Sequence, residues 1–454
     1  MTEDRGRICG PDHARLPSVS VAAQPSQLAA PADAGTRIRA IIGGSIGNLV
    51  EWYDWYVYSF FTLYFAKVFF PSGNQTVQLL NTAAIFAVGF LVRPIGSWLM
   101  GIYADRAGRR AALVLSMVAM GGGSLMIALT PGHNRIGVMA PVLLVLARVI
   151  QGLSVGGEYG ASATYLSEVA GRKWRGFWSS FQYVTLIMGQ LLALVVLLIL
   201  QRLLTNAQIS DWGWRVPFAV GAFCALAALW VMLGIEETRS FEAVKRRATP
   251  VQTWKLMGQH PRELMIVVGL TMGGTIGFYT FSNYAQRFLV NTSGFSAQTA
   301  SQIAAASSVV FMLLQPVMGC LSDLIGRRPL LIGFGAIGAL TTVPFMTTLA
   351  VTKSSTMAFV IVTLALVNIS AYTSIGAVFK AELFPAEIRA LGVGLPYAIV
   401  VSIFGGSAEY IALKLKTMGH EPWFYWFVSA CMAIAFITGL TMRDTMRHSR
   451  IVED

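Results

Sequence analysis

Several charged side chains lie within long apolar stretches of the sequence, where a charge is costly to bury, and four of them are the main candidates for chemistry. Glu51 and Asp54 are three positions apart in one stretch, so a helix would place them on the same face. Arg93 and Arg148 lie in two further stretches. A guanidinium can hold a carboxylate through two parallel hydrogen bonds, and a carboxylate can take up and release a proton. Charged groups in such surroundings commonly mark a substrate or ion pathway.

These residue types predict a site for an organic anion and a proton. Arg93 precedes Gly101 by ~12 Å along a helix, too far for its side chain to reach the end of a span easily. We therefore expect Arg93 and Arg148 to bind substrate carboxylates, and Glu51 and Asp54 to carry the proton. The alternative is structural: one of the two acids forms a fixed salt bridge with an arginine.

Other polar residues in the apolar stretches are secondary candidates. Glu158 is interpreted as a second proton station or gate contact, or else as a hydrogen-bonded structural acid. Lys380 is expected to extend its side chain toward the end of a span. Glu409 either pairs with Lys414 at the membrane surface or has a functional role. The polar side chains ranked highest for contact with substrate are Tyr53, Gln182 and Tyr279.

The elements that position these residues are predicted to be membrane-spanning helices. Of the 454 residues, 55% are hydrophobic and only 12% are charged, against about 25% charged in typical soluble domains. The fold class is therefore an all-α membrane protein, with twelve transmembrane helices in two pseudo-symmetric six-helix bundles. The predicted spans are 39–66, 79–101, 111–130, 139–167, 177–201, 214–235, 264–290, 297–320, 329–350, 357–382, 391–414 and 422–442.

The domain boundaries follow from the polar interruptions. We predict a disordered cytoplasmic tail at 1–36, an N-terminal bundle at 37–235 and a cytoplasmic central loop at 236–263. A C-terminal bundle at 264–442 and a cytoplasmic C-terminal tail at 443–454 complete the chain.

Two matching loops indicate that the two halves are related. Each contains a glycine, an aspartate, a second glycine and a pair of arginines in the same register, 218 positions apart. A second pair of matching segments, Glu168 to Arg175 and Glu382 to Arg389, repeats at an offset of 214. We expect both loops to act as gates. Their residues are Gly101, Asp105, Arg106, Gly108, Arg109 and Arg110 in the first copy, and Gly319, Asp323, Gly326, Arg327 and Arg328 in the second.

The distribution of basic residues predicts the orientation. The net charge of +12 resides mainly in loops that alternate along the chain. This pattern favours both termini in the cytoplasm, since Lys and Arg are enriched in short cytoplasmic loops. On this interpretation Arg287 belongs to the opposite, outer side. Binding to nucleic acid is not needed to explain the charge.

The first loop, together with two other segments, resembles a known transporter family. The pattern G-x-x-x-D-R-x-G-R-R at 101–110 resembles the signature loop of the major facilitator superfamily. The segment from Arg148 to Glu158 is similar to that superfamily's fourth-span motif. The segment from Gly47 to Asp54 is similar to its metabolite:proton symporters. The resemblance implies that spans 1, 4, 7 and 10 line a central cavity, and that the halves rock about it.

From the residues and this resemblance together, we expect a secondary active transporter that couples uptake of a dicarboxylate to protons, with α-ketoglutarate as the first choice. The alternatives are another organic acid (citrate, shikimate or a ketoadipate), a zwitterion such as proline or betaine, and a nutrient sensor on a transporter scaffold. No Walker, zinc-protease or nucleophile motif occurs, so we expect no enzyme, cofactor or metal. The expected partners are a small organic acid, a proton and the lipid bilayer of a bacterial inner membrane, with the protein acting as a monomer.

Overall fold

The computed structural model describes residues 34–107, 109–155, 172–233, 258–385 and 388–451. Two compact units are distinguished, Met1–Ile42 and Gly43–Asp454, and the contacts below all lie within the second. Helices and the turns between them account for the described residues, without a strand among them.

The N-terminal half contains six long helical segments. Short helices lie at the connections between them: α5 (His133–Ile136), η1 (Arg172–Trp174), α9 (Asn206–Gln208) and η2 (Ile209–Gly213). The long segments are α1 (Ala34–Phe69), α2 (Gln75–Leu91) continued by α3 (Arg93–Ala107), α4 (Arg109–Leu129), α6 (Met139–Val155), α8 (Arg175–Leu203) and α10 (Arg215–Leu233).

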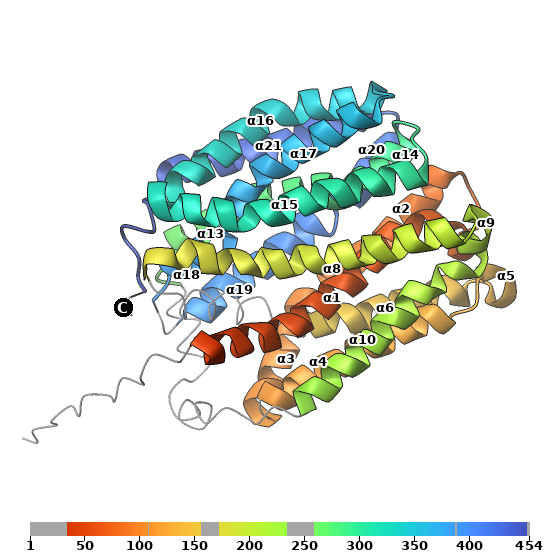
Figure 1. The fold of residues 1–454 in the computed structure, drawn as a ribbon, viewed down its shortest axis with the longest axis horizontal. Helices are drawn as coiled ribbons and strands as arrows, with labels where there is room; N and C mark the ends of the chain where they lie inside the picture. Colours follow the sequence, from red (N-terminus) through yellow and green to blue (C-terminus); the bar gives the residue numbers. More distant parts are fainter. Residues whose placement is uncertain (1–33, 108, 156–171, 234–257, 386–387, 452–454) are drawn as a thin grey trace, which may run out of the picture. The chain divides into compact units, whose positions relative to one another are not determined.

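The C-terminal half repeats this plan with more interruptions. Figure 1 draws most of its helices above those of the first half, with α8 and α15 side by side where the halves meet, in agreement with their contacts. Its segments are α13 (Pro261–Phe278), η3 (Tyr279–Tyr284) and α14 (Ala285–Asn291), α15 (Ala297–Ile325), α16 (Arg327–Val351), α17 (Ser355–Thr373) and α18 (Gly376–Leu383), α19 (Arg389–Val400), η4 (Val401–Gly405) and α20 (Ala408–Thr417), and α21 (Glu421–Thr441).

Most of these segments can cross a membrane. Among the described residues, eight helices have the length and apolar composition of a membrane span. The count becomes nine if Asn206–Gly213 and Arg215–Trp230, which are bent by 49° at Trp214, are taken as one span. The other three segments of the N-terminal half, α1, α4 and α6, occupy the positions at which the sequence predicts spans. The all-helical membrane architecture predicted from composition is confirmed.

Several spans are discontinuous, which the apolar pattern did not predict. The span that begins at Gln75 breaks at Val92, and α3 starts at the next residue. Two spans of the C-terminal half contain a π-helical turn, at Tyr279–Tyr284 and at Val401–Gly405. Such irregular turns leave backbone groups available for other partners and often occur at functional sites.

Two ends of the helix assembly are used below as reference points. The motif end is where α15 meets α16 at Gly326, whose positive φ of 97° favours glycine at this turn. The far end is where α16 meets α17, after Val351. At the motif end, the C-terminal segment 442–451 packs onto α18, because the Arg450 backbone N–H donates to the Glu382 carbonyl at 3.0 Å.

Candidate functional site

The break between α2 and α3 places Arg93 inside the protein. Pro94 has no backbone N–H, so the Phe90 carbonyl four residues earlier lacks its usual helical donor. The Ser402 hydroxyl from η4 donates to that carbonyl instead, at 2.6 Å. Because of the proline, the Phe90 carbonyl can accept a hydrogen bond from the other half of the protein, directly beside Arg93.

The Arg93 guanidinium lies in an aromatic box. Its carbon is 3.8 Å from the ring centre of Phe90, 4.2 Å from that of Trp55 and 5.6 Å from that of Trp52. The side chain is only 6% exposed. Guanidinium groups stack well on aromatic faces, and the stacking leaves the N–H donors free to point along the plane of the group.

Two donor nitrogens of Arg93 remain available for a ligand. Within the part of the chain that the structure describes, nothing accepts a hydrogen bond from Nε or Nη2. The Tyr279 hydroxyl, from the start of η3, hydrogen-bonds with the guanidinium, and Glu51 lies within electrostatic range of it. A buried donor without an acceptor is costly, so this pair of nitrogens matches the two oxygens of an incoming carboxylate.

A second polar network joins Asp54 to Arg148 within the N-terminal half. The Asp54 carboxylate accepts hydrogen bonds from the Ser124 hydroxyl and from Gln151 Nε2. Arg148 Nη1 donates to Gln151 Oε1 at 2.8 Å, and its guanidinium lies 3.8 Å from the Tyr58 ring centre. Gln151 thus lies between Asp54 and Arg148, for which a direct salt bridge was the structural alternative. As with Arg93, Arg148 Nε and Nη2 have no acceptor among the described residues.

The remaining predicted substrate contacts lie in different surroundings. The Tyr53 hydroxyl donates to the Pro217 carbonyl of α10 at 3.0 Å, so it already has a partner within the N-terminal half. Gln182 is buried on α8. Tyr279 packs edge-on against Phe90, with ring centres 5.4 Å apart, and is therefore part of the Arg93 surroundings. Glu158 lies outside the described residues.

Sequence reasoning missed a buried ion pair toward the far end. Arg287 on α14 is fully buried and pairs with Glu409 on α20, with Nη2 donating to Oε2 at 2.6 Å. Nη1 also donates to the Ser59 carbonyl on α1, in the other half. The count of basic residues treated Arg287 as a surface charge, whereas it is buried. Of the two alternatives for Glu409, the pairing with Lys414 is excluded. Only the three-dimensional packing shows this, since the two partners are 122 positions apart.

Lys380 was also misplaced. It is fully buried on α18, and its Nζ lies 4.3 Å from the Tyr397 ring centre and 5.5 Å from those of Tyr372 and Phe379. The side chain does not extend to the end of the span. Of the three rings only Phe379 is adjacent in the sequence, so the sequence alone did not indicate this environment.

The second repeated loop connects the two halves at the motif end. The Asp323 carboxylate accepts from the backbone N–H groups of Gly176 and Phe177, at 2.8 and 3.0 Å, in the first turn of α8. Arg327 Nη1 donates to the same carboxylate at 2.7 Å. A Cβ on Gly319 would lie 2.6 Å from the Gly176 carbonyl oxygen, which explains why the close approach of α15 and α8 requires glycine.

The second repeated segment contributes to the same contact. Glu382 on α18 lies 3.6 Å from Arg327 Nη2 and 3.9 Å from Arg175 Nη1, which belongs to the other half. Thr445 of the C-terminal segment donates to Glu382 at 2.6 Å. We call Asp323, Arg327, Glu382 and Arg175 the motif-end latch. In the first loop, Gly108 and the other side chains from 104 to 113 lie outside the described part, so its gating role stays a prediction.

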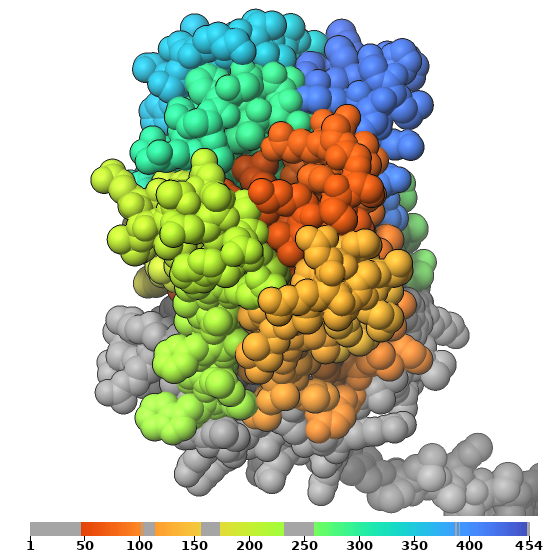
Figure 2. Space-filling model, turned by 90° about the vertical axis from the view of Figure 1, so that its right-hand side faces the viewer, coloured from red at the N-terminus to blue at the C-terminus, as the bar shows by residue number. Residues whose placement is uncertain are grey.

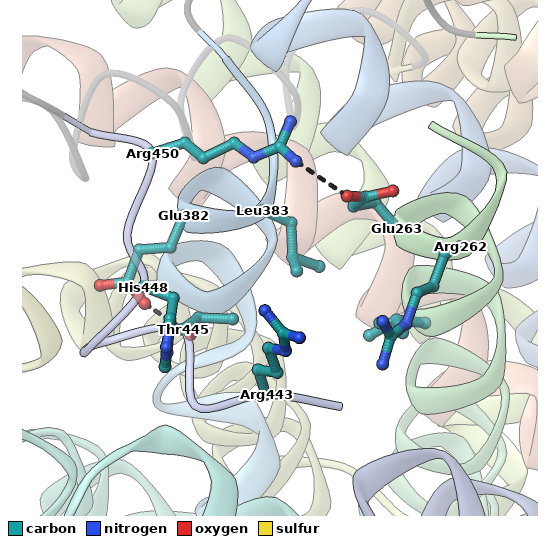
Figure 3. Close-up of a pocket in the computed structure, with 9 residues that line it drawn as sticks. Arg262, Glu263, Glu382, Leu383, Arg443, Thr445, His448 and Arg450 are labelled. Carbon is teal, nitrogen blue, oxygen red and sulfur yellow. Dashed lines mark hydrogen bonds and ion pairs between the residues drawn. The ribbon is translucent and has the colours of Figure 1, made fainter. Parts of the chain in front are cut away.

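A pocket lies next to the latch (Figure 3). It is formed by the first turn of α13, the end of α18 and the C-terminal segment, and Arg450 points across it to Glu263 at 3.0 Å. Of the latch residues it shares only Glu382, and it includes none of the residues around Arg93. The candidate substrate site therefore rests on the buried charges between the halves, whereas this pocket belongs to the motif end.

The halves also meet at the far end. Thr76 at the start of α2 donates to the Asn291 side chain at the end of α14, at 3.2 Å. Gln201 on α8 donates to Ser301 on α15 at the same distance. Figure 2 looks onto this face and shows segments of both halves packed together. The buried charges thus lie in a chain whose halves contact each other at both ends.

Comparison with known proteins gives a family match over nearly the whole chain. The model of the family described as "sugar (and other) transporter" matches residues 40–252 and 242–445. Alpha-ketoglutarate permease of Escherichia coli K12 is 52% identical over 421 residues, which cover 92% of this chain and 96% of that protein. A citrate-proton symporter of Klebsiella pneumoniae is 32% identical, covering 84% of this chain and 86% of that one.

A solved structure gives the same fold. The xylose transporter XylE from E. coli, in a partially occluded inward-open conformation, matches with a TM-score of 0.69. The match covers 87% of this chain and 95% of that one at 20% identity. At this level of identity the match concerns the arrangement of helices alone, and that arrangement is the one predicted from the duplicated loops.

Proposed function

We propose a specific transport activity for this chain. The chain belongs to the sugar (and other) transporter family of the major facilitator superfamily. The activity is proton-coupled uptake of a dicarboxylate, with α-ketoglutarate as the preferred substrate. Transport proceeds by alternating access, as the two halves open first at one end and then at the other. The 52% identity to the E. coli permease supports the choice of substrate.

The observation that carries the proposal is the state of Arg93. A buried guanidinium with two unmatched donors, stacked on Phe90 and Trp55, is suited to a planar anion. The 2-oxo acid end of α-ketoglutarate is planar, and in this proposal Tyr279, which hydrogen-bonds with Arg93, contacts it as well. Arg93 therefore holds this end of the substrate, with the fork of its guanidinium on the carboxylate.

The two acidic residues of α1 take different parts in proton coupling. Glu51 lies within range of Arg93 and competes with the substrate for its positive charge. Protonation of Glu51 removes that competition, so a proton and a substrate anion bind together. Asp54 is held by Ser124 and Gln151, and it balances the charge of Arg148. The coupling thus follows from charge neutralisation beside a single guanidinium.

Alternating access uses the contacts at the two ends of the assembly. The motif-end latch closes one end, and the contacts of Arg287, Thr76 and Gln201 close the other. Opening at either end requires breaking one of these sets while the other holds. The proposed setting is the bacterial inner membrane, with both termini in the cytoplasm and a functional monomer.

Purified protein in proteoliposomes provides the test. With an imposed inward proton gradient, labelled α-ketoglutarate is expected to accumulate above its external concentration, and a proton uncoupler should abolish the accumulation. Uptake that the uncoupler leaves unchanged would remove the claim of symport. Normal transport by both Arg93→Ala and Arg148→Ala variants would remove the proposed roles of these charges.

Citrate is the second candidate substrate, because the Klebsiella symporter is 32% identical over most of the chain. Competition separates the two candidates. Unlabelled α-ketoglutarate should suppress labelled uptake at far lower concentration than citrate, shikimate or proline does. The reverse order for citrate would reassign the substrate while leaving the transport activity in place.

A further inference from the structure

Lys380 is a buried cation that the proposed function leaves without a role. It lies on α18 in the C-terminal half, with no exposed surface, among the rings of Tyr397, Tyr372 and Phe379. Cations buried within membrane-spanning segments are rare and are generally tied to substrate or ion pathways. Cation–π contacts with the three rings hold the ammonium group in place.

Tyr397 connects this lysine to the Arg93 surroundings. Its ring lies 4.3 Å from Lys380 Nζ, and its hydroxyl is within electrostatic range of the Arg93 guanidinium. Tyr397 belongs to α19, which contacts α3, the helix that begins with Arg93. One tyrosine thus neighbours two buried cations, one from each half of the protein.

We propose that Lys380 binds the second carboxylate of the dicarboxylate substrate while Arg93 binds the 2-oxo acid end. This assignment rests on the proposed function. The two cations suit the two ends: a stacked, planar guanidinium matches the planar 2-oxo acid, and a compact ammonium matches a carboxylate at the end of a flexible chain. Lys380 is then the residue that selects dicarboxylates over monocarboxylates.

The location of Lys380 favours it over Arg148 for this role. Arg148 stacks on Tyr58, whose hydroxyl donates to the Thr82 carbonyl of α2, and it donates to Gln151 on its own helix. These contacts keep Arg148 within the N-terminal half. A dianion that spans Arg93 and Lys380 instead contacts both halves, so its binding energy is available to draw them together. A monocarboxylate contacts only one of them.

A matched pair of ligands tests the assignment. α-Ketovalerate has the same five-carbon chain and 2-oxo acid end as α-ketoglutarate, with a methyl group in place of the second carboxylate. Dissociation constants for both ligands are measured by calorimetry on purified wild type and on Lys380→Met, whose side chain has a similar length and suits an aromatic environment. Lys414→Met, at an exposed position on α20, is the matched control.

Wild type and the control variant should bind α-ketoglutarate far more tightly than α-ketovalerate. In Lys380→Met, the affinity for α-ketoglutarate is expected to fall about 10- to 100-fold, as for the loss of a charged hydrogen bond. The affinity for α-ketovalerate should remain unchanged, so the preference disappears. Lys380→Arg keeps the positive charge, so this variant should retain part of the preference for α-ketoglutarate over α-ketovalerate. A purely structural role would reduce binding of both ligands alike.

The outcomes separate this inference from the proposed function. If wild type binds neither ligand, the proposed function fails. If wild type binds α-ketoglutarate and Lys380→Met keeps the full preference for it, the assignment of Lys380 is overturned. The same holds if Arg148→Gln, rather than Lys380→Met, abolishes the preference. Thermal unfolding checks each variant, and Lys380→Gln replaces the methionine variant in the same comparison if the latter does not fold.

Discussion

The two carboxyl groups of α1 show how neighbouring residues of the same charge acquire different roles. Glu51 and Asp54 share a helix face, yet Asp54 accepts hydrogen bonds from Ser124 and Gln151, whereas Glu51 lies near Arg93. Hydrogen bonds to a carboxylate stabilise its charged form. An acid within electrostatic range of the arginine proposed to bind substrate responds to a bound anion directly. Glu51 is therefore the better candidate for the coupled proton.

Replacing Glu51 with glutamine is expected to separate binding from coupling. The amide mimics the protonated acid, so Arg93 stays available and α-ketoglutarate still exchanges across the membrane. Accumulation driven by a proton gradient should be lost, because no proton is taken up or released. Counterflow and gradient-driven uptake in proteoliposomes measure the two activities. Glu421→Gln, at the far end, serves as control, and full gradient-driven uptake by Glu51→Gln would exclude this role.

Arg93 should not tolerate lysine. An ammonium cannot reproduce the planar fork or the stacking on Phe90 and Trp55. We expect Arg93→Lys to raise the dissociation constant for α-ketoglutarate at least about tenfold, which corresponds to ~1.4 kcal/mol. Calorimetry measures this, with the exposed Arg202→Lys as the matched substitution. If Arg93→Lys bound α-ketoglutarate as tightly as Arg202→Lys does, Arg93 would act only as a point charge.

At the scale of single elements, the first turn of α8 depends on a residue from the other half. Its backbone N–H groups at Gly176 and Phe177 have no helical acceptor and donate to Asp323 instead. A carboxylate at a helix N-terminus is also favoured by the helix dipole. The latch is thus a helix cap supplied across the interface between the halves.

Asp323→Asn keeps the shape of this cap but removes its charge. The loss should be about 1 kcal/mol, or roughly a fivefold shift in favour of the open latch. Amide hydrogens in the first turn of α8 are then expected to exchange faster with deuterium, as measured by mass spectrometry. Asp211→Asn, at an exposed position near the start of α10, should leave that turn unaffected. Unchanged exchange in Asp323→Asn would show that the charge does not hold the latch closed.

At the scale of the whole molecule, the sequence predicted the plan but not its interruptions. Apolar runs and the duplicated loops were sufficient for the two halves, because length and hydrophobicity determine a membrane span. Length and hydrophobicity alone could not locate the breaks at Val92 or Tyr279, although Pro94 next to the first break is a helix-breaking residue. The charges nearest the breaks, Arg93 and Glu51, were recognisable because a charge in an apolar run stands out.

Charges near the ends of apolar runs were harder to interpret. Position along a span suggested that Lys380 and Arg287 reach the surface, but both are fully buried. Their burial depends on rings and acids contributed by helices distant in sequence, as the Arg287 contacts to Glu409 and Ser59 show. A count of basic residues by loop treats such buried cations as surface charges. Their roles could be recognised only once the two halves were seen packed together.

The contacts that close the far end provide the last prediction. Thr76 and Asn291 belong to opposite halves, and their side chains are 3.2 Å apart. In a variant with Thr76→Cys and Asn291→Cys, mild oxidation should join the halves at this end and stop transport, and reduction should restore it. Alternating access requires this result, because a substrate cannot pass an end that is held shut.

Each single cysteine variant, oxidised in the same way, is the control for the native thiols, which include Cys224, Cys320 and Cys431. Binding of α-ketoglutarate from the motif end should survive in the cross-linked protein, since the latch there remains free to open. Uptake that continues after complete cross-linking, as judged by mass spectrometry, would mean that the far end does not open during transport. The rocking of two halves about the buried charges would then have to be abandoned.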